Sequence, residues 1–246
     1  MDFESATADA ESLSIEGWDL APLRGHARMD AHPWDYVAEV KRRLAVAESL
    51  LDIGTGDGAL LASMAPLPQI VTAIEGYAPM VPIARARLAP LGVTVVATDI
   101  EQPLPFADQS FDAIVNARAY FTAGEVARLL KPGGWFITEQ VASGNDRELY
   151  EQLLSATIEV EPDASRMASE LASLGLRVTD VREAFIDHHF LDIWGVVYYL
   201  RLIRWQLPDF SVTRYRNGLE SIHQCILEHG EFVAKSRRYL LTATRD

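Results

Sequence analysis

The stretch Ser49-Leu-Leu-Asp-Ile-Gly-Thr-Gly-Asp-Gly-Ala-Leu-Leu61 contains the residues that decide the fold. A short apolar run ends at three glycines, Gly54, Gly56 and Gly58, and an apolar stretch that favours a helix follows. This pattern predicts a buried strand, a tight turn and the start of a helix. Glycine suits such a turn because it adopts positive φ at little cost and lets a ligand approach the backbone. The first amides of a helix attract ligand oxygens, so a nucleotide-like ligand is the expected occupant.

The spacing of the glycines narrows the class of ligand. Dinucleotide-binding proteins carry G-x-G-x-x-G, whereas these glycines fall as G-x-G-x-G, with Asp52 two positions before the first. The pattern D-x-G-x-G-x-G resembles motif I of the class I S-adenosylmethionine (AdoMet) methyltransferases, of the methyltransferase type 11 kind. AdoMet carries an ammonium and a sulfonium, so a nearby carboxylate suits it. A ligand-free glycine turn and a Rossmann dehydrogenase are the alternatives.

Composition limits the classes of partner. The chain has 246 residues, 49% hydrophobic and 23% charged, and can bury the core of one large α/β domain with an appendage. The net charge of −13 argues against general nucleic-acid affinity, which depends on Lys and Arg. The single cysteine, Cys225, excludes an intrachain disulfide and a cysteine metal cluster. The sequence shows neither a signal peptide nor an apolar run of membrane-spanning length. We therefore expect a cytoplasmic monomer or homodimer without membrane contact.

Acidic residues follow the second and third predicted strands. The strand Ile70–Ile74 ends at Glu75, whose carboxylate can accept hydrogen bonds from both hydroxyls of a ribose. The strand Val93–Thr98 precedes Asp99 and Ile100; the resemblance implies that Asp99 accepts a hydrogen bond from the adenine amino group and that Ile100 packs on the ring. The full set expected to bind the cofactor is Arg28, Asp52, Gly54, Thr55, Gly56, Gly58, Glu75, Gly76, Asp99, Ile100 and Asn116.

The fourth predicted strand, Phe111–Asn116, points its carboxyl end at the same site, because ligands of open α/β sheets bind at the carboxyl ends of strands. Asn116 and Tyr120 are therefore candidate site residues. Nitrogen- and DNA-methylating relatives often carry Asn/Asp-Pro-Pro-Tyr here, and this chain has no Pro-Pro, so the pattern does not support base methylation of that type. No clustered acids indicate a catalytic Mg²⁺, and no metal is expected.

Two segments outside the core allow two interpretations each. Residues 1–16 are expected to be a flexible arm with at most a short helix. Residues 17–35 are either a packed segment or a lid, in which Arg28 meets the AdoMet carboxylate and His26 or His32 the acceptor. Arginines and aromatics mix between 193 and 219, either as a surface for a flat anionic acceptor or as packed aromatics beside charge-balancing arginines. The arginines of this segment are Arg201, Arg204, Arg214 and Arg216, and its aromatic residues are Tyr198, Tyr199, Trp205 and Tyr215.

The predicted architecture is α/β, a Rossmann-like doubly wound seven-stranded sheet whose last strand is antiparallel. A helical cap is inserted between the last two strands. The expected division is an N-terminal arm, helix and lid (1–48), an AdoMet-binding core (49–190), the cap (191–234) and a final core strand (235–246). Within it, Asn145 or Asp146 is expected to cap a helix over 145–160, and the final strand is expected over 239–244.

The resemblance implies an AdoMet-dependent methyltransferase that moves the sulfonium methyl by SN2 to an oxygen, nitrogen or carbon of a small molecule. The protein then mainly aligns the nucleophile, and a general base helps an oxygen acceptor. His26, Tyr120 and His188 are the candidate catalytic residues. His188 and His189 are neighbours on the sixth predicted strand and point to opposite faces, so they cannot simply share a metal. The alternatives are an RNA methyltransferase that uses the cap and a non-catalytic AdoMet-binding regulator.

Overall fold

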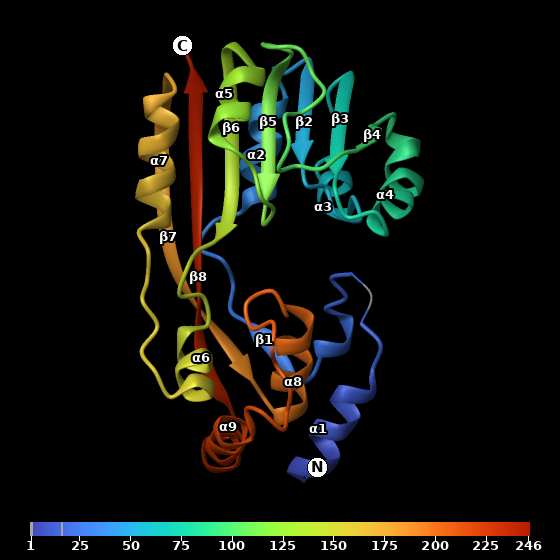
Figure 1. The fold of residues 1–246 in the computed structure, drawn as a ribbon. Helices are drawn as coiled ribbons and strands as arrows, with labels where there is room; N and C mark the ends of the chain where they lie inside the picture. The colour runs from blue at the N-terminus through green and yellow to red at the C-terminus, as the bar shows by residue number, and fades with distance from the viewer. Residues whose placement is uncertain (1, 16) are drawn as a thin grey trace. The chain divides into compact units, whose positions relative to one another are not determined.

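The computed structural model describes residues 2–15 and 17–246 and divides into two compact units. Unit 1 comprises Met1–His32, Ser143–Glu161 and Phe185–Arg237, and unit 2 comprises Pro33–Ala142, Pro162–Ala184 and Arg238–Asp246. Strands β7 (Leu176–Phe190) and β8 (Phe232–Arg245) each have residues in both units (Figure 1). Compared with the predicted division, residues 143–161 and 185–190 join the unit that holds the cap helices.

Unit 2 is built on parallel strands in the spatial order β4, β3, β2, β5, β6 (Figure 1). Their bounds are Thr94–Ala97, Ile70–Glu75, Ser49–Ile53, Phe111–Ala117 and Leu130–Val141. Strand β8 pairs with β6 in the antiparallel sense, from Trp135 opposite Thr244 to Val141 opposite Arg238. The predicted Rossmann-like sheet with an antiparallel last strand is therefore confirmed.

Side chains of successive strand residues enter different cores, as the two-residue period of a strand requires. Leu51, Phe136 and Leu241 belong to one apolar cluster, whereas their neighbours Leu50, Ile137 and Leu240 belong to another. All five residues of β2 are buried, which is typical of a parallel strand covered on both faces. The helices of unit 2 are α2 (Tyr36–Leu44), α3 (Ala59–Ser63), α4 (Met80–Leu88), α5 (Ala123–Leu129) and α7 (Asp163–Ser173).

Unit 1 has a core of its own. Helices α1 (Phe3–Ser12), α6 (Arg147–Leu154), α8 (Ile193–Leu202) and α9 (Arg216–His229) contribute to it, with the short strand β1 (Ala27–Met29). Helix α8 is buried from Ile193 through Leu200, so it is apolar on all sides. A Cβ on Gly195 would lie 2.7 Å from the His26 carbonyl oxygen, and one on Gly218 would lie 2.7 Å from the Gln152 carbonyl oxygen. Glycine at these positions therefore permits close packing.

The structure corrects several predicted elements. Within residues 2–15 and 17–246 the sheet has eight strands rather than the predicted seven, because β1 pairs antiparallel with β7. The final strand begins at Phe232, not at 239, because the polar run Lys235–Arg238 interrupts the apolar pattern within it. Residues 3–12 form a helix whose Ala6 and Ala10 are buried, whereas Met1 and Glu16, also in the predicted arm, lie outside the described residues. Among residues 2–15 and 17–246, no helix has both the length and the apolar character that crossing a membrane requires.

The start of α6 also differs from the prediction. The helix covers Arg147–Leu154, and Asp146 precedes it with a φ of 51° and no side-chain capping bond. Asp146 occupies the N-cap position, as predicted. Its side chain makes no capping bond, because it accepts from the Tyr199 hydroxyl instead, and the Asn145 side chain accepts from Ser236.

Candidate functional site

The glycine turn after β2 has three residues in the left-handed region. Gly54, Gly56 and Gly58 have φ values of 74°, 61° and 79°. A Cβ on Gly54 would collide with the Ala119 side chain, and one on Gly58 would lie 2.8 Å from Leu88 Cγ, so these two glycines permit packing. A Cβ on Gly56 would meet no atom within 4 Å. The turn therefore leaves open space at Gly56, where a ligand can lie against the backbone.

Glu75, the last residue of β3, holds this turn in place. Its side chain is largely buried, with 8% of the residue exposed. Oε2 accepts a hydrogen bond from the Gly56 N–H at 2.7 Å, and Oε1 accepts one from the Tyr77 N–H at 2.7 Å. A carboxylate has about four lone-pair positions, so each oxygen can still accept a second bond, for example from a hydroxyl.

A pocket of about 480 Å³ lies beside Glu75, within the range of small-ligand sites. Glu75, Gly76 and Asp99 line it, together with Ala78, Val81, Pro82, Arg85, Ala97 and Thr98. A Cβ on Gly76 would approach the Thr98 carbonyl oxygen to 3.2 Å, so the end of β3 passes close to the segment after β4. Asp99 is exposed and Ile100 half-buried. Residues predicted to meet ribose and adenine thus share one pocket wall.

Asp52 lies in β2 just before the turn and is 8% exposed. Its burial raises the pKa of the carboxyl to about 6, and repulsion from Glu75 adds to the rise. The buried Thr55 hydroxyl lies close enough to oppose this rise, yet makes no hydrogen bond of good geometry with any described residue. A cationic ligand group near Asp52, or a polar one near Thr55, would satisfy these side chains.

The end of β5 supplies Asn116 and the loop to Tyr120. Asn116 is fully buried; its amide donates to the Ile53 carbonyl at 2.9 Å, and its oxygen accepts from Thr138 and Gln140. The Asn116 side chain is therefore committed to the sheet. Tyr120 is 53% exposed, and its neighbour Ala119 abuts Gly54, so Tyr120 lies near the glycine turn.

His188 belongs to unit 1, where a buried carboxylate orients it. Its Nδ1 lies 3.0 Å from Oδ1 of Asp146, a residue with no exposed surface. Oδ2 of Asp146 accepts hydrogen bonds from the Tyr199 hydroxyl at 2.5 Å and the Asn145 amide at 2.6 Å. A carboxylate at Nδ1 places the proton there and leaves Nε2 as the basic nitrogen. Sequence reasoning missed Asp146 because its partners are distant in the chain and its position resembled a helix cap.

His26 and Arg28 also belong to unit 1, and each has a carboxylate partner. His26 Nδ1 lies 2.6 Å from Oδ2 of Asp192, and the imidazole stacks on Trp194 with ring centroids 4.2 Å apart. Arg28 donates to Asp30 at 3.0 Å. Of the predicted residues, the glycines, Asp52, Thr55, Glu75, Asp99, Ile100, Asn116 and Tyr120 belong to unit 2, and His26, Arg28 and His188 belong to unit 1.

The part of the chain that carries the glycine turn is similar to known methyltransferases. A family model described as "Methyltransferase domain" matches residues 51–138, from β2 into β6. A demethylmenaquinone methyltransferase of Tropheryma whipplei is 35% identical over 115 residues. That match covers 43% of this chain and 46% of the relative, so the chain spans about half the length of this curated protein.

Solved structures show the same fold. The YcgJ protein of Bacillus subtilis has a TM-score of 0.59 at 20% identity, over 85% of this chain and 98% of that one. A geranyl diphosphate methyltransferase in complex with SAM has a TM-score of 0.51 at 15% identity, over 85% of this chain and 84% of its own. At these identities the likeness concerns the fold alone.

Proposed function

We propose that this chain is a class I methyltransferase that binds AdoMet and transfers the methyl group to a small molecule, because its residues 51–138 match a methyltransferase-domain family model. The observation that carries this proposal is the pocket of unit 2, which joins Glu75, Gly76 and Asp99 beside the open space at Gly56. When bound, AdoMet supplies an electrophilic methyl group on its sulfonium.

The candidate cofactor-binding residues of unit 2 have separate roles in this proposal. Glu75 accepts hydrogen bonds from the ribose hydroxyls, and Asp99 accepts one from the adenine amino group. Ile100 packs on the adenine ring. Asp52 attracts the ammonium, and Gly56 leaves room for the ligand. The Asn116 side chain joins β5 to its two neighbouring strands, because it donates to Ile53 of β2 and accepts from Thr138 of β6.

Calorimetry with AdoMet and S-adenosylhomocysteine tests the cofactor assignment. Glu75→Ala and Asp99→Ala should each weaken binding by roughly 1–3 kcal/mol, the cost of removing a hydrogen-bond acceptor. Glu101→Ala is the matched control, because this exposed neighbour of Asp99 is outside the pocket lining. Glu75→Gln keeps one acceptor oxygen and should lose less than the alanine variant. Unchanged affinity in both alanine variants, or binding of a dinucleotide in place of AdoMet, would refute the assignment.

We further propose His188 as the general base for an oxygen acceptor, with Asp146 as its positioning residue. The 3.0 Å contact from Nδ1 to the buried carboxylate supports this, because it fixes the tautomer in which Nε2 takes the proton. His26, held by Asp192, and Tyr120, beside the glycine turn, are the other candidates. Arg28 remains the proposed partner of the AdoMet carboxylate.

The pH dependence of single-turnover methyl transfer tests the base. His188→Gln should lower the rate about 10²- to 10⁴-fold, as removal of a general base does, and leave AdoMet affinity unchanged. Asp146→Asn should lower the rate less and displace the acidic limb of the pH profile, because the imidazole loses its carboxylate. Tyr199→Phe, which keeps both members of the pair, is the control. Full activity of His188→Gln at neutral pH would exclude this role.

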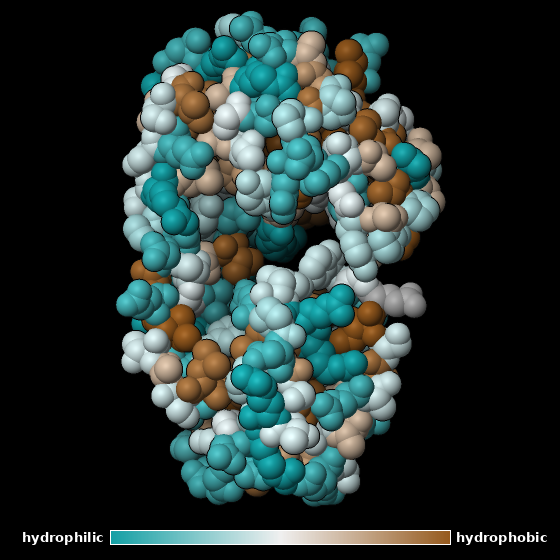
Figure 2. Space-filling view, in the orientation of Figure 1, coloured by the Kyte–Doolittle hydropathy of each residue, from teal (hydrophilic) through white to brown (hydrophobic). Residues whose placement is uncertain are grey.

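A small-molecule acceptor is favoured over RNA by the contacts of the arginine-rich segment. Arg201 donates to the Ala10 and Leu13 carbonyls, Arg214 pairs with Asp209 at 3.0 Å, and Arg216 pairs with Glu220 at 2.8 Å. Tyr198, Tyr199 and Tyr215 are buried in the unit 1 core, whereas Trp205 is exposed. On the face of unit 1 shown in Figure 2, hydrophilic and hydrophobic residues are interspersed.

A transfer assay with labelled AdoMet separates the alternatives. Label in a small-molecule fraction supports the proposal, and the name of the Tropheryma relative makes quinones a sensible first set of acceptors. Label in RNA, with binding that weakens steeply as salt rises, would support an RNA methyltransferase. AdoMet binding without transfer to either fraction would support a regulator.

A further inference from the structure

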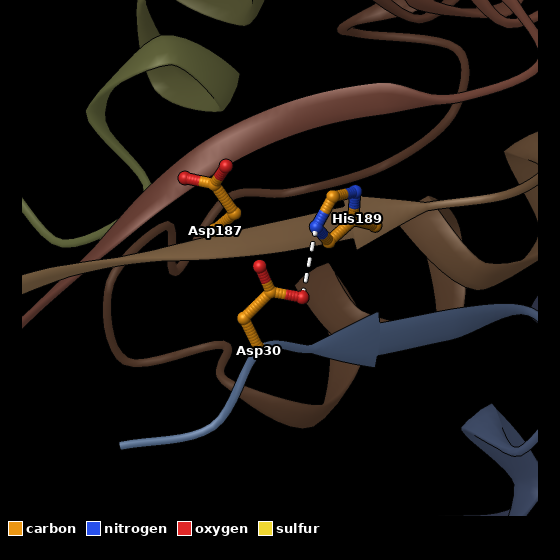
Figure 3. Close-up of side chains that lie close together, drawn as sticks. All are labelled: Asp30, Asp187 and His189. Carbon is orange, nitrogen blue, oxygen red and sulfur yellow. Dashed lines mark ion pairs between the residues drawn. The ribbon is translucent and has the colours of Figure 1, made fainter. Parts of the chain in front are cut away.

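Three potential metal ligands of unit 1 lie together although they are distant in the sequence. Asp187 and His189 are two residues apart on β7, so their side chains point to the same face of the strand. The Asp30 N–H, just after β1, donates to the Asp187 carbonyl at 2.9 Å, which places Asp30 opposite Asp187. One ligand atom from each residue lies within 4.8 Å of the other two. Figure 3 shows Asp187 and His189 on β7 and Asp30 on the neighbouring segment, with the Asp30 carboxylate facing His189.

We propose that Asp30, Asp187 and His189 bind a divalent transition-metal ion, with Zn²⁺ as the probe. One imidazole nitrogen and two carboxylates suit zinc, whereas Mg²⁺ and Ca²⁺ prefer oxygen ligands alone. The two carboxylates also neutralise the two charges of the ion. This assignment is independent of the proposed methyl transfer.

His189 gives an observation independent of the acidic residues. The residue is 7% exposed, and its Nε2 is buried without a hydrogen-bond partner among the described residues. Nε2 faces Oδ1 of Asp30 at 3.3 Å, the ion pair dashed in Figure 3. His189 Nε2 and Asp30 Oδ1 therefore lie close together without forming a hydrogen bond, an arrangement in which both atoms can bind one ion.

Glu231 can set the tautomer that metal binding requires. His189 Nδ1 lies 3.1 Å from Glu231 Oε2 and 3.0 Å from an Arg28 guanidinium nitrogen. A guanidinium only donates and a carboxylate only accepts, so Nδ1 can bond to one of them at a time. When Nδ1 carries the proton and donates to Glu231, Nε2 presents its lone pair to the metal. A carboxylate behind a ligating histidine is the common arrangement in metal sites.

Each of the two carboxylates already pairs with a cationic side chain. Lys235 Nζ pairs with Asp187, and Arg28 pairs with Asp30 at 3.0 Å. Their side chains are 47% and 52% exposed, so both can turn into water. Exposed ion pairs of this kind contribute little free energy, and a three-ligand chelate of a transition metal exceeds them. A bound ion would then fasten the three-residue strand β1 to β7.

Calorimetric titration of the untagged, chelator-treated full chain with ZnCl₂ tests the site. The wild type should bind one equivalent, and His189→Ala and Asp187→Asn should each lose at least about tenfold in affinity. Glu231→Gln should lose about tenfold, as removal of an outer hydrogen-bond partner does. Lys235→Met should gain affinity because a competing cation is removed, and this gain keeps the test decisive if the ligand variants fail to fold. Zn²⁺ should also slow hydrogen exchange in residues 27–30.

A second possible zinc contact provides the matched control. Cys225 Sγ lies 3.8 Å from His229 Nδ1 on α9, and Cys225→Ser should leave zinc affinity unchanged. Absence of zinc binding in the wild type would overturn the proposal. So would binding that Cys225→Ser removes and His189→Ala retains, or tighter binding of Mg²⁺ or Ca²⁺ than of Zn²⁺.

Discussion

Asp52 carries a buried negative charge with little compensation in the ligand-free protein. Its carboxyl has a pKa raised from 3.8 to about 6, first by burial and then by repulsion from Glu75. Between these pH values the folded chain binds more protons than the unfolded chain. The contribution of Asp52 to the free energy of unfolding should therefore fall as pH rises from about 4 to about 6.

Asp52→Asn should stabilise the protein at neutral pH. The amide keeps the size of the side chain without the charge, so the variant should gain roughly 2–3 kcal/mol above pH 7, the equivalent of the pKa rise. The gain should shrink toward pH 4, where the wild-type carboxyl is protonated. Urea denaturation at several pH values measures both effects. If the free energy of unfolding depended on pH equally in the wild type and in Asp52→Asn, the buried charge of Asp52 would not be destabilising.

At the scale of elements, two glycines of the turn between β2 and α3, Gly56 and Gly58, have different surroundings. Gly58 faces Leu88, and Gly56 faces open space, although both have positive φ. Packing and ligand binding can therefore be separated by substitution.

Gly56→Ala and Gly58→Ala should differ in their effects. Alanine at position 58 adds a collision with Leu88 to backbone strain, so stability should fall by about 2 kcal/mol or more. Alanine at position 56 should cost only about 1 kcal/mol of backbone strain, yet weaken AdoMet binding by more than that because its methyl group fills the ligand's space. Thermal unfolding and calorimetry on the two variants measure these quantities. If Gly56→Ala lost less AdoMet affinity than Gly58→Ala, the open space at Gly56 would not be part of the ligand site.

Local patterns were enough to predict the parallel strands and the glycine turn. Apolar runs mark β2, β3 and β5, and the sheet confirms these strands. The first part of β8 was not predicted, because the polar run Lys235-Ser-Arg-Arg238 separates Phe232–Ala234 from the apolar residues of the predicted strand. β1 has three residues, too few for a periodic signal.

At the scale of the whole molecule, contacts between distant residues set the limits of sequence reasoning. The cofactor residues follow a recurring order along the chain, so the resemblance could propose them. Asp146 with His188, and Asp30 with His189, become neighbours only through folding. No spacing in the sequence indicates either pair.

The two units should respond separately to a substitution in one of them. Gly218→Ala should lower stability, because its Cβ would lie 2.7 Å from the Gln152 carbonyl oxygen and the Leu153 Cα, forcing α9 away from α6 in unit 1. Binding of adenosine below the unfolding temperature should be unchanged, since the residues proposed to hold the adenosine belong to unit 2. Gly124→Ala in α5 is the control; its Cβ meets no atom within 4 Å, and helix propensity should add stability. Weaker ligand binding in Gly218→Ala would show that the units are coupled.

Unit 1 consists of three stretches of the chain, and two strands carry residues of both units. A chimaera that takes this unit from a homologue must therefore exchange all three stretches at once, with junctions inside β7 and β8. A single crossover between the genes of two homologues would combine part of the unit 1 core of one protein with part of the unit 1 core of the other. Recombination should thus transmit the two units together, and specificity should diverge by point substitution rather than by exchange of a cassette.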